Sequence, residues 1–187
     1  MKTKDLAFIA LFAAITCVLG LVPGVQVGPV PITAQTLGVM LAGAILGARR
    51  AFLALLLFLV LVAVGLPVLP GGRGGLAVFA SPTAGYLLSW PIAAFLVGLL
   101  TERFWLQYDV LRGVLANIVG GIVAVYAIAV PILKIVTGLA WSDAIWLGAA
   151  IFIPSDLIKA VIAASIAVQV RRSYPVIERP RRVGAHR

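Results

Sequence analysis

Long apolar runs, separated by short charged or Gly/Pro-rich stretches, make up most of this chain. Runs of about 16 to 18 residues are at the short end of what an α-helix needs to cross a hydrocarbon core of about 30 Å. The pattern therefore predicts an all-α integral membrane protein with six transmembrane helices. These helices are expected at residues 6–22, 32–47, 51–66, 83–100, 114–130 and 154–170. Arg49 and Arg50 are expected to form a tight turn between the second helix and the third.

Composition supports the membrane class, because 63% of the 187 residues are hydrophobic and only 11% are charged. The net charge of +9 does not indicate nucleic-acid binding. Basic residues gather instead at the helix ends that fall on one side when the predicted spans alternate, whereas the other side holds only Arg73 and Lys134. By the positive-inside rule, both termini are predicted to be cytoplasmic. The expected location is the plasma membrane, as a multi-pass protein.

The predicted membrane domain covers residues 1–172. Residues 173–187 form a basic tail with Pro175 and Pro180 and little apolar surface, so we expect a disordered cytoplasmic segment that contacts anionic membrane lipid.

Three longer loops are predicted on the external side, at residues 23–31, 67–82 and 131–153. They are rich in Gly or Pro but remain apolar, which is unusual for solvated linkers. Irregular backbone at membrane depth is tolerated where it packs on protein or lines a cavity, so these loops are predicted to cap a site. Constrained turns between short helices are the alternative. In the third loop, Ser142 is expected to cap a short helix carrying Trp141 and Trp146.

Asp156 and Lys159 stand one helical turn apart inside the last apolar run, just after Pro154. Charged side chains within a bilayer are costly, and they usually pair with each other, bind a ligand or line a cavity. The spacing of three residues places both on one face, so a simple internal ion pair and a ligand site are both open.

Polar side chains gather at three predicted helix starts that face the same side. A helix N-terminus offers free N–H groups and a positive dipole end, which suits a polar or anionic ligand. Ser and Thr are also common N-caps, so each one taken alone could be structural. The candidate ligand-binding residues are Thr33, Gln35, Ser81, Thr83, Tyr86, Asp156 and Lys159, with Thr36 beside them.

The chain lacks the groups that the common classes of enzyme chemistry need. The only histidine is His186 in the tail, Asp156 is the only carboxylate predicted at a membrane site, and there is no Walker A motif. The chain is therefore predicted not to be an enzyme, to need no cofactor or metal, and to contain no energy source of its own.

On the first helix, Ala10 and Ala14 are small residues four apart, a spacing that allows another helix to approach closely.

Three ordered segments resemble the BioY family, the biotin-specific membrane subunits (S components) of energy-coupling factor (ECF) transporters. They are Pro31-Ile-Thr-Ala-Gln35, then Gly71-Gly-Arg-Gly-Gly75 continuing to Ser81-Pro-Thr-Ala-Gly-Tyr86, and Phe152-Ile-Pro-Ser-Asp-Leu-Ile-Lys159. The resemblance covers essentially residues 1–172.

This resemblance implies a six-helix S-component fold that captures biotin from the external side. It also implies docking on a transmembrane coupling (T) protein with two ABC-type ATPases, through the surface that holds Ala10 and Ala14. Asp156 and Lys159 are expected to contact biotin, and the external loops to close the pocket. The ureido oxygen and the valerate carboxylate are both reasonable partners for Lys159, and the sequence does not choose between them. Trp90, Phe79 and Tyr86 are candidates to pack against the ring.

Three other interpretations stay open at this point. A secondary transporter would use Asp156 as a proton-coupling group with a raised pKa. An S component for another vitamin would share the scaffold and differ in its loops. A structural membrane protein would bind no ligand, and Asp156 and Lys159 would only pair with each other.

Overall fold

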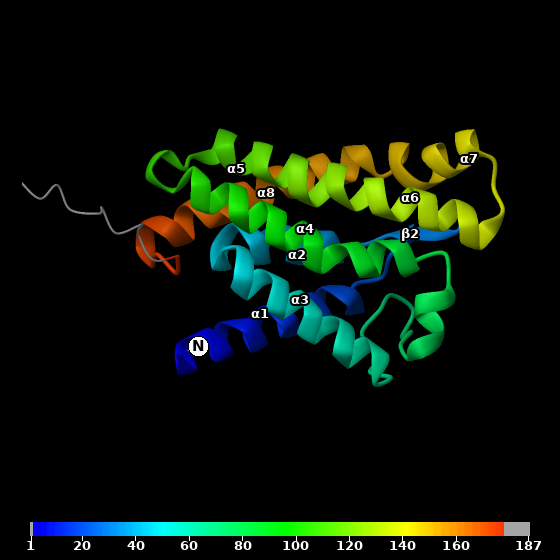
Figure 1. Cartoon of the computed structure of the whole chain (residues 1–187), viewed down its shortest axis with the longest axis horizontal. Helices are drawn as coiled ribbons and strands as arrows, with labels where there is room; N and C mark the ends of the chain where they lie inside the picture. The colour runs from blue at the N-terminus through cyan, green and yellow to red at the C-terminus, as the bar shows by residue number, and fades with distance from the viewer. Residues whose placement is uncertain (1, 178–187) are drawn as a thin grey trace, which may run out of the picture.

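The computed structural model describes residues 2–177 as a mostly helical protein with one small β-hairpin (Figure 1). The elements occur in this order: α1 (Thr3–Leu21), β1 (Val25–Val27), β2 (Val30–Ile32), α2 (Gln35–Leu46), α3 (Ala48–Ala63), η1 (Leu76–Ala80), α4 (Ala84–Arg103), η2 (Trp105–Gln107), α5 (Val110–Asn117), η3 (Ile118–Val123), α6 (Ala124–Thr137), α7 (Trp141–Ile145), η4 (Trp146–Ala150) and α8 (Ile153–Ser173). The segments η1 and η2 are 3₁₀ turns, and η3 and η4 are π-helical.

The helices pack around α4, which contacts α2, α3, α5 and α6. In Figure 1, α1 and α3 lie on one side of α2 and α4, and α5, α6 and α8 lie on the other. Small residues allow these close contacts: Ala51, Ala54, Ala93 and Ala94 on α3 and α4 are fully buried. The first and last described helices reach the same end of the molecule, whereas the hairpin, η1 and α7 gather at the opposite end.

Four helical segments of the described chain are long and apolar enough to cross a membrane, judged by length and composition. They are Thr3–Leu21, Ala84–Arg103, Val110–Thr137 and Trp141–Ser173, and Gln35–Leu46 is a shorter apolar helix. The prediction of a helical membrane protein is therefore confirmed in its coarse form, and the hairpin β1–β2 is a departure from the all-α class.

The turn between α2 and α3 lies at Gly47, and the prediction of a turn at Arg49 and Arg50 was wrong. Gly47 has φ of 80°, a conformation that side-chain-bearing residues rarely adopt, so it ends α2 and starts α3 within one residue. Both arginines belong to the first turn of α3. Arg50 uses its charge to contact Asp5 of α1, with Nε 2.9 Å from the carboxylate.

The sequence pattern predicted that the fifth helix ends before Pro131, and this prediction was wrong. The helical run continues from Val110 to Thr137, with Pro131 inside α6 and a π-helical segment at η3. Proline is tolerated inside membrane helices when neighbouring groups satisfy the freed carbonyl groups. The predicted loop 131–153 is consequently mostly helical, and α7 begins after Ala140 without a side-chain cap from Ser142.

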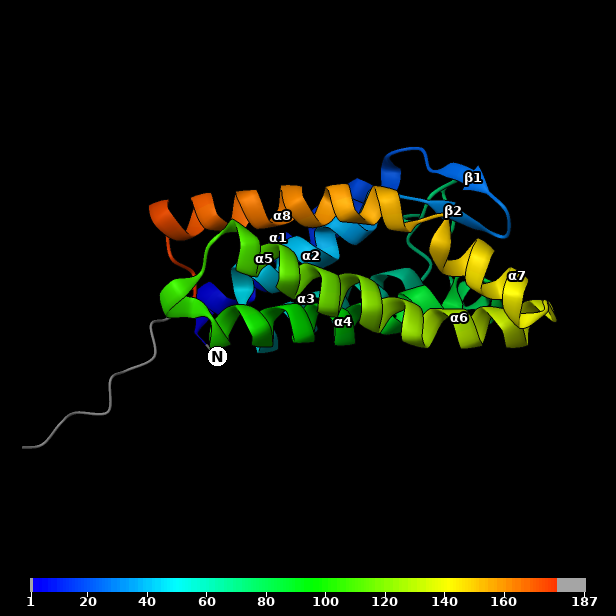
Figure 2. The ribbon, with the colours of Figure 1, turned by 90° about the horizontal axis from the view of Figure 1, so that it is seen from above.

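The first predicted loop forms the antiparallel hairpin β1–β2, in which Val27 pairs with Val30. The turn of the hairpin contains Gly28, with φ of 76°. Figure 2 shows this hairpin beside the start of α8, at the same end of the molecule as α7. The second loop is held by an isolated bridge between Leu69 and Arg73 and then by η1. Both loops are thus ordered covers over one end of the helices.

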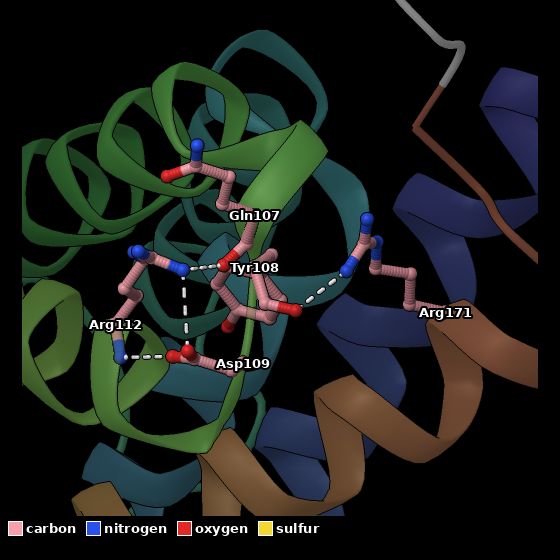
Figure 3. Close-up of polar contacts among 5 residues, drawn as sticks. All are labelled: Gln107, Tyr108, Asp109, Arg112 and Arg171. Carbon is pink, nitrogen blue, oxygen red and sulfur yellow. Dashed lines mark hydrogen bonds and ion pairs between the residues drawn. The ribbon is translucent and has the colours of Figure 1, made fainter.

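At the opposite end, side-chain contacts tie the α4–α5 connection to α8 (Figure 3). Asp109 caps α5 by accepting a hydrogen bond from the backbone N–H of Arg112, and the Arg112 guanidinium contacts Asp109 and the carbonyl of Gln107. Arg171 of α8 donates to the carbonyl of Tyr108 and lies over the ring of Trp105, 4.9 Å from its centroid. This cation–π contact fixes the last turn of α8 against the connection.

Residues 173–177, assigned from sequence to the disordered tail, pack against the membrane domain. Lys4 of α1 donates to the hydroxyl of Tyr174, Arg50 donates to the carbonyl of Val176, and Ile177 is buried. The apolar residues Val176 and Ile177 supply the contact area that the basic part of the tail lacks. The rest of the predicted tail, residues 178–187 with His186, lies outside the described residues.

Gly98 sets how closely α4 approaches α3. A Cβ atom at this position would lie 2.4 Å from the backbone nitrogen of Ala48, so any side chain must push the two helices apart. We expect Gly98→Ala to destabilise the protein by about 1 to 3 kcal/mol, the usual range for overpacking a tight contact. Thermal unfolding in detergent measures the effect, with Leu99→Ala as the control because Leu99 is exposed on the same helix. Equal midpoints for the two variants would contradict the close-packing role.

Candidate functional site

A cavity lies between the start of α8 and the two ordered loops, at the end of the molecule that holds the hairpin. Its apolar lining comes from the hairpin, the 64–75 loop, α4 and the residue before α8: Val30, Pro31, Leu69, Pro70, Leu87, Trp90 and Phe152. Its polar lining consists of Thr33, Gln35, Thr36, Arg73, Thr83, Tyr86, Asp156 and Lys159. A mainly apolar cavity with a few converging polar groups is the usual form of a small-molecule site.

Asp156 is the centre of the polar network, and it is only 3% exposed. One carboxylate oxygen accepts hydrogen bonds from Lys159 Nζ at 2.8 Å and from the Thr36 hydroxyl at 3.1 Å. The other oxygen accepts from the Tyr126 hydroxyl at 2.5 Å. Lys159 also donates to Thr36 Oγ1 at 3.0 Å. The carboxylate is therefore held from three helices, α2, α6 and α8, which orients it rigidly toward the cavity.

The start of α8 explains why this pair points inward. Pro154 occupies the first turn, where the missing N–H costs nothing, and the N–H of Asp156 closes the turn onto the carbonyl of Phe152. Asp156 and Lys159 then share one face of α8, as their spacing predicted. The ion pair expected in the structural interpretation is present. Because both members also line the cavity, the pair and a ligand site are compatible.

Gln35 connects the helices to the covering loop. Its side-chain nitrogen donates to the carbonyl of Thr16 in α1 at 3.2 Å and to the carbonyl of Val68 in the 64–75 loop at 3.1 Å. Gln35 is 1% exposed, so these two bonds satisfy donors that would otherwise be buried without partners. This side chain positions the loop that forms one wall of the cavity.

The predicted residues near α4 differ in their relation to the cavity. Thr33, Thr83 and Tyr86 line it, and the Tyr86 hydroxyl donates to the carbonyl of Gly148 in η4 at 2.5 Å. Tyr86 therefore presents its ring to the cavity, beside Phe152. Ser81 does not line the cavity: its hydroxyl donates to the carbonyl of Val78 and lies 2.8 Å from Thr83 Oγ1. Ser81 therefore contacts a residue of the lining, Thr83, without lining the cavity itself.

Sequence reasoning missed Tyr126 and Arg73 and proposed Trp90 only as a packing aromatic. Tyr126 lies in the middle of a long apolar run, and nothing in that run shows that it reaches Asp156. Arg73 lies within a glycine-rich segment that the sequence indicated only as a loop. Trp90 lines the cavity and stacks on Phe58, and its buried indole N–H has no hydrogen-bond partner among the described residues. That N–H is a free donor at the wall of the site.

No group of three or more His, Cys, Asp or Glu residues that could hold a metal ion occurs within residues 2–177. The groups that line the cavity suit ligand binding by hydrogen bonds and packing. They are a carboxylate acceptor, ammonium and guanidinium donors, hydroxyl groups and aromatic rings.

Ala10 and Ala14 do not line the cavity, and both lie on the exposed side of α1. The same side carries Leu11 and Val18, which are more than half exposed, whereas Ile9, Phe12 and Ala13 face the core. The two alanines thus form a shallow strip on an outward face.

Comparison with known proteins gives one consistent result. The model of the BioY family matches residues 1–176. The biotin transporter BioY of Rhizobium etli is 52% identical over 95% of this chain and 98% of its own, and the probable biotin transporter BioY of Bacillus subtilis is 43% identical over 92% and 93%. The crystal structure of the S-component for biotin from an ECF-type ABC transporter superposes with a TM-score of 0.86 at 30% identity, covering 92% of this chain and 95% of that one.

These relatives are named as transporters, and the described chain carries several membrane-length helices. The protein is accordingly a multi-pass membrane transport protein and not an enzyme, as its sequence predicted. Family model, relatives and solved structure agree over nearly the full length, and the chain belongs to the BioY family.

Proposed function

We propose that this protein is the biotin-capturing subunit of an ATP-driven importer of the ECF type. The observation that carries the proposal is the Asp156 network at the base of a mainly apolar cavity. Biotin combines a ureido group with two N–H donors and one strong acceptor, an apolar thioether ring, and a chain ending in a carboxylate. Donors, acceptors and apolar walls of matching kind line the cavity.

The ureido group would bind at the inner end of the cavity. Asp156 accepts from the ureido N–H groups, and Lys159 or Thr36 donates to the ureido oxygen. Hydrogen bonds that involve a charged partner are about twice as strong as neutral ones, so this end supplies most of the specificity. The rings of Tyr86, Trp90 and Phe152 pack against the bicyclic ring, and Trp90 can donate its free N–H. Thr33, Thr83 and Gln35 complete the wall, with Ser81 behind Thr83.

Orientation in the membrane follows from charge. The helices form six spans, with α2 and α3 short, and both termini are cytoplasmic. Support comes from the end of the molecule where α1 and α3 begin and α8 ends, because the residues at the helix ends there include Lys2, Lys4, Arg49, Arg50, Arg103, Arg112, Arg171 and Arg172. The cavity then opens toward the external side of the plasma membrane, beneath the hairpin and the 64–75 loop.

Energy for release must come from partners, since no P-loop is present in the sequence. The partners are a transmembrane coupling protein and two ABC-type ATPases, and the docking surface is the strip of Ala10 and Ala14 on α1. This strip allows a partner helix to approach closely. The solved relative belongs to a transporter of this class.

Equilibrium binding of labelled biotin to the detergent-purified chain tests the proposal. We expect tight, saturable binding that unlabelled biotin displaces and that thiamine and riboflavin do not. Displacement by another vitamin alone would assign a different substrate to the same scaffold. Well-folded protein without saturable binding would leave Asp156 and Lys159 as a purely structural pair.

The energy source is tested separately, by uptake of labelled biotin in cells that carry or lack the ATPases. We expect uptake to require the ATPases and to survive a protonophore as long as cellular ATP is maintained. Uptake that a protonophore abolishes but that is indifferent to the ATPases would indicate proton coupling through Asp156.

A further inference from the structure

A groove lies on the surface of the molecule between α3 and α4, and it shares no lining residue with the cavity described above. Four apolar side chains and one arginine line it: Arg49, Phe52 and Leu53 of α3, and Ile92 and Phe95 of α4. The rings of Phe52 and Phe95 meet edge to face, with their centroids 6.4 Å apart. The groove has a volume of about 410 Å³, within the range of small-molecule sites, about 300 to 1,000 Å³. Arg49 and Ile92 are exposed, so the groove is open to the surroundings of the protein.

The two arginines at the start of α3 differ in their partners. Arg50 pairs with Asp5 of α1, with Nε 2.9 Å from the carboxylate. Arg49 makes no ion pair or side-chain hydrogen bond with any of residues 2–177. Glu102, an acid near this turn, instead accepts a hydrogen bond from the backbone N–H of Ala48 at 2.8 Å. The positive charge of Arg49 is thus left without a contacting counter-charge beside an apolar groove.

Arg49 lies at the end of the groove that faces the cytoplasm in the proposed orientation. It belongs to the first turn of α3, which begins at the end of the molecule where α1 begins and α8 ends (Figure 1). With 16 residues at about 1.5 Å each, α3 is about 24 Å long, shorter than a hydrocarbon core of about 30 Å. A span this short brings its flanking residues close to the lipid headgroups. The phosphate groups of the cytoplasmic leaflet are therefore the anions within reach of Arg49.

We propose that this groove binds one anionic phospholipid of the cytoplasmic leaflet. The Arg49 guanidinium donates parallel N–H bonds to the phosphate oxygens, and an acyl chain lies between α3 and α4. The occupant combines a negative head with an apolar chain because the lining combines one unpaired cation with four apolar walls. Basic pockets between membrane helices on the cytoplasmic side typically bind anionic headgroups. The choice of leaflet rests on the orientation given with the proposed function, whereas lipid binding itself does not.

Other occupants match the lining less well. A phosphatidylcholine headgroup carries its own cation, and no acid lines the groove to meet it. An apolar helix of a partner protein would cover Arg49 and leave its charge desolvated without a counter-charge, which is costly. An anionic lipid supplies the counter-charge and the apolar contact together.

Native mass spectrometry of the detergent-purified chain counts the lipids that stay bound. Dioleoyl phosphatidylglycerol and dioleoyl phosphatidylcholine are the probes, because they share their chains and differ in headgroup charge. We expect one phosphatidylglycerol per chain, bound about tenfold more tightly than phosphatidylcholine, the usual effect of one charge-assisted contact. Arg49→Gln should erase this preference. Arg172→Gln should keep it, because it removes the same charge from the exposed last turn of α8, outside the groove.

A second pair of variants tests the apolar part of the groove. Ile92→Trp fills the groove without a change in charge and should weaken phosphatidylglycerol binding about tenfold, equivalent to about two CH₂ groups losing contact. Leu115→Trp adds the same ring to the exposed side of α5, outside the groove, and should bind the lipid normally. Biotin binding should be unchanged in all four variants, because none of the altered residues lines the cavity. The result is therefore separable from the proposed function.

Four results would overturn the lipid site. Arg49→Gln could keep the preference, or Arg172→Gln could lose it equally, which would reduce the effect to the net charge of the chain. Unchanged lipid binding by Ile92→Trp would exclude an acyl chain from the groove. Displacement of phosphatidylglycerol by an equimolar amount of glycerol 3-phosphate would show that a soluble anion occupies Arg49. Loss of co-purification with the coupling protein in Ile92→Trp, at full lipid binding, would assign the groove to a protein partner.

Discussion

Asp156→Asn should abolish high-affinity biotin binding while leaving the protein folded. The substitution keeps the shape of the side chain but removes the negative charge that accepts hydrogen bonds from Lys159, Thr36 and Tyr126. Lys159 is then left as an unpaired cation in a mostly buried site, and the ligand loses its charged acceptor. Disrupting one partner of a buried charge pair costs about 2 to 5 kcal/mol, so affinity should fall by roughly 30-fold or more.

The matched control for this change is Asp143→Asn. Asp143 lies in α7 at the same end of the molecule, is exposed and does not line the cavity. Asp143→Asn therefore makes the same change in charge away from the site. Titration calorimetry with biotin gives the affinities, and thermal unfolding without ligand shows that both variants are folded. Biotin affinity within about twofold of the unaltered protein in Asp156→Asn would refute the assignment of the site.

Ala14→Trp should stop transport without weakening the capture of biotin. Ala14 lies on the outward side of α1 and does not line the cavity, so an indole ring there points away from the core and from the ligand contacts. A partner helix that approaches closely at Ala10 and Ala14 would be held away by the ring, because small residues are what allow such an approach. Uptake in cells that contain the coupling protein and the ATPases should fall to background.

Val60→Trp is the control for this change. Val60 is 51% exposed on α3, so the same bulky ring is added to a different outward face. We expect Val60→Trp to transport normally, and Ala14→Trp to bind biotin in detergent but to lose co-purification with the coupling protein. Normal transport by Ala14→Trp would show that the docking surface does not include this part of α1. Loss of both binding and transport would show that the ring disturbs the fold.

The helical class of the protein and most of its helix positions were predictable, and the deviations have local physical causes. The predicted helix at 154–170 matches α8 within three residues at its end, because Pro154 and the charged pair mark its start and Arg171 follows its apolar part. Pro131 misled the prediction because a membrane helix can continue through a proline when its neighbours and a π-helical turn adjust. Gly47 was overlooked as the turn because two arginines beside it gave a stronger polar signal.

Some residues of the candidate site could likewise be predicted from the sequence, and others could not. Asp156, Lys159, Thr36 and Gln35 could be proposed from sequence because polar residues in apolar runs are rare and their spacing defines a face. Tyr126 and Arg73 could not, because a tyrosine in an apolar run is common and an arginine in a glycine-rich loop is normally solvated. Their contributions depend on contacts between residues far apart in the chain, such as the 2.5 Å bond from Tyr126 to Asp156.

The sequence by itself determined that this is a helical membrane protein, which end of it is positively charged, and which motifs relate it to the BioY family. Hydropathy, charge and helical spacing are local properties, and a linear pattern records them fully. Only the tertiary structure decided that three helices hold the carboxylate of Asp156, that Ser81 lies behind Thr83 and outside the cavity lining, and that Arg73 lines the cavity. Those facts depend on how α2, α6, α8 and the loops pack together, and packing brings together residues whose proximity no local pattern contains.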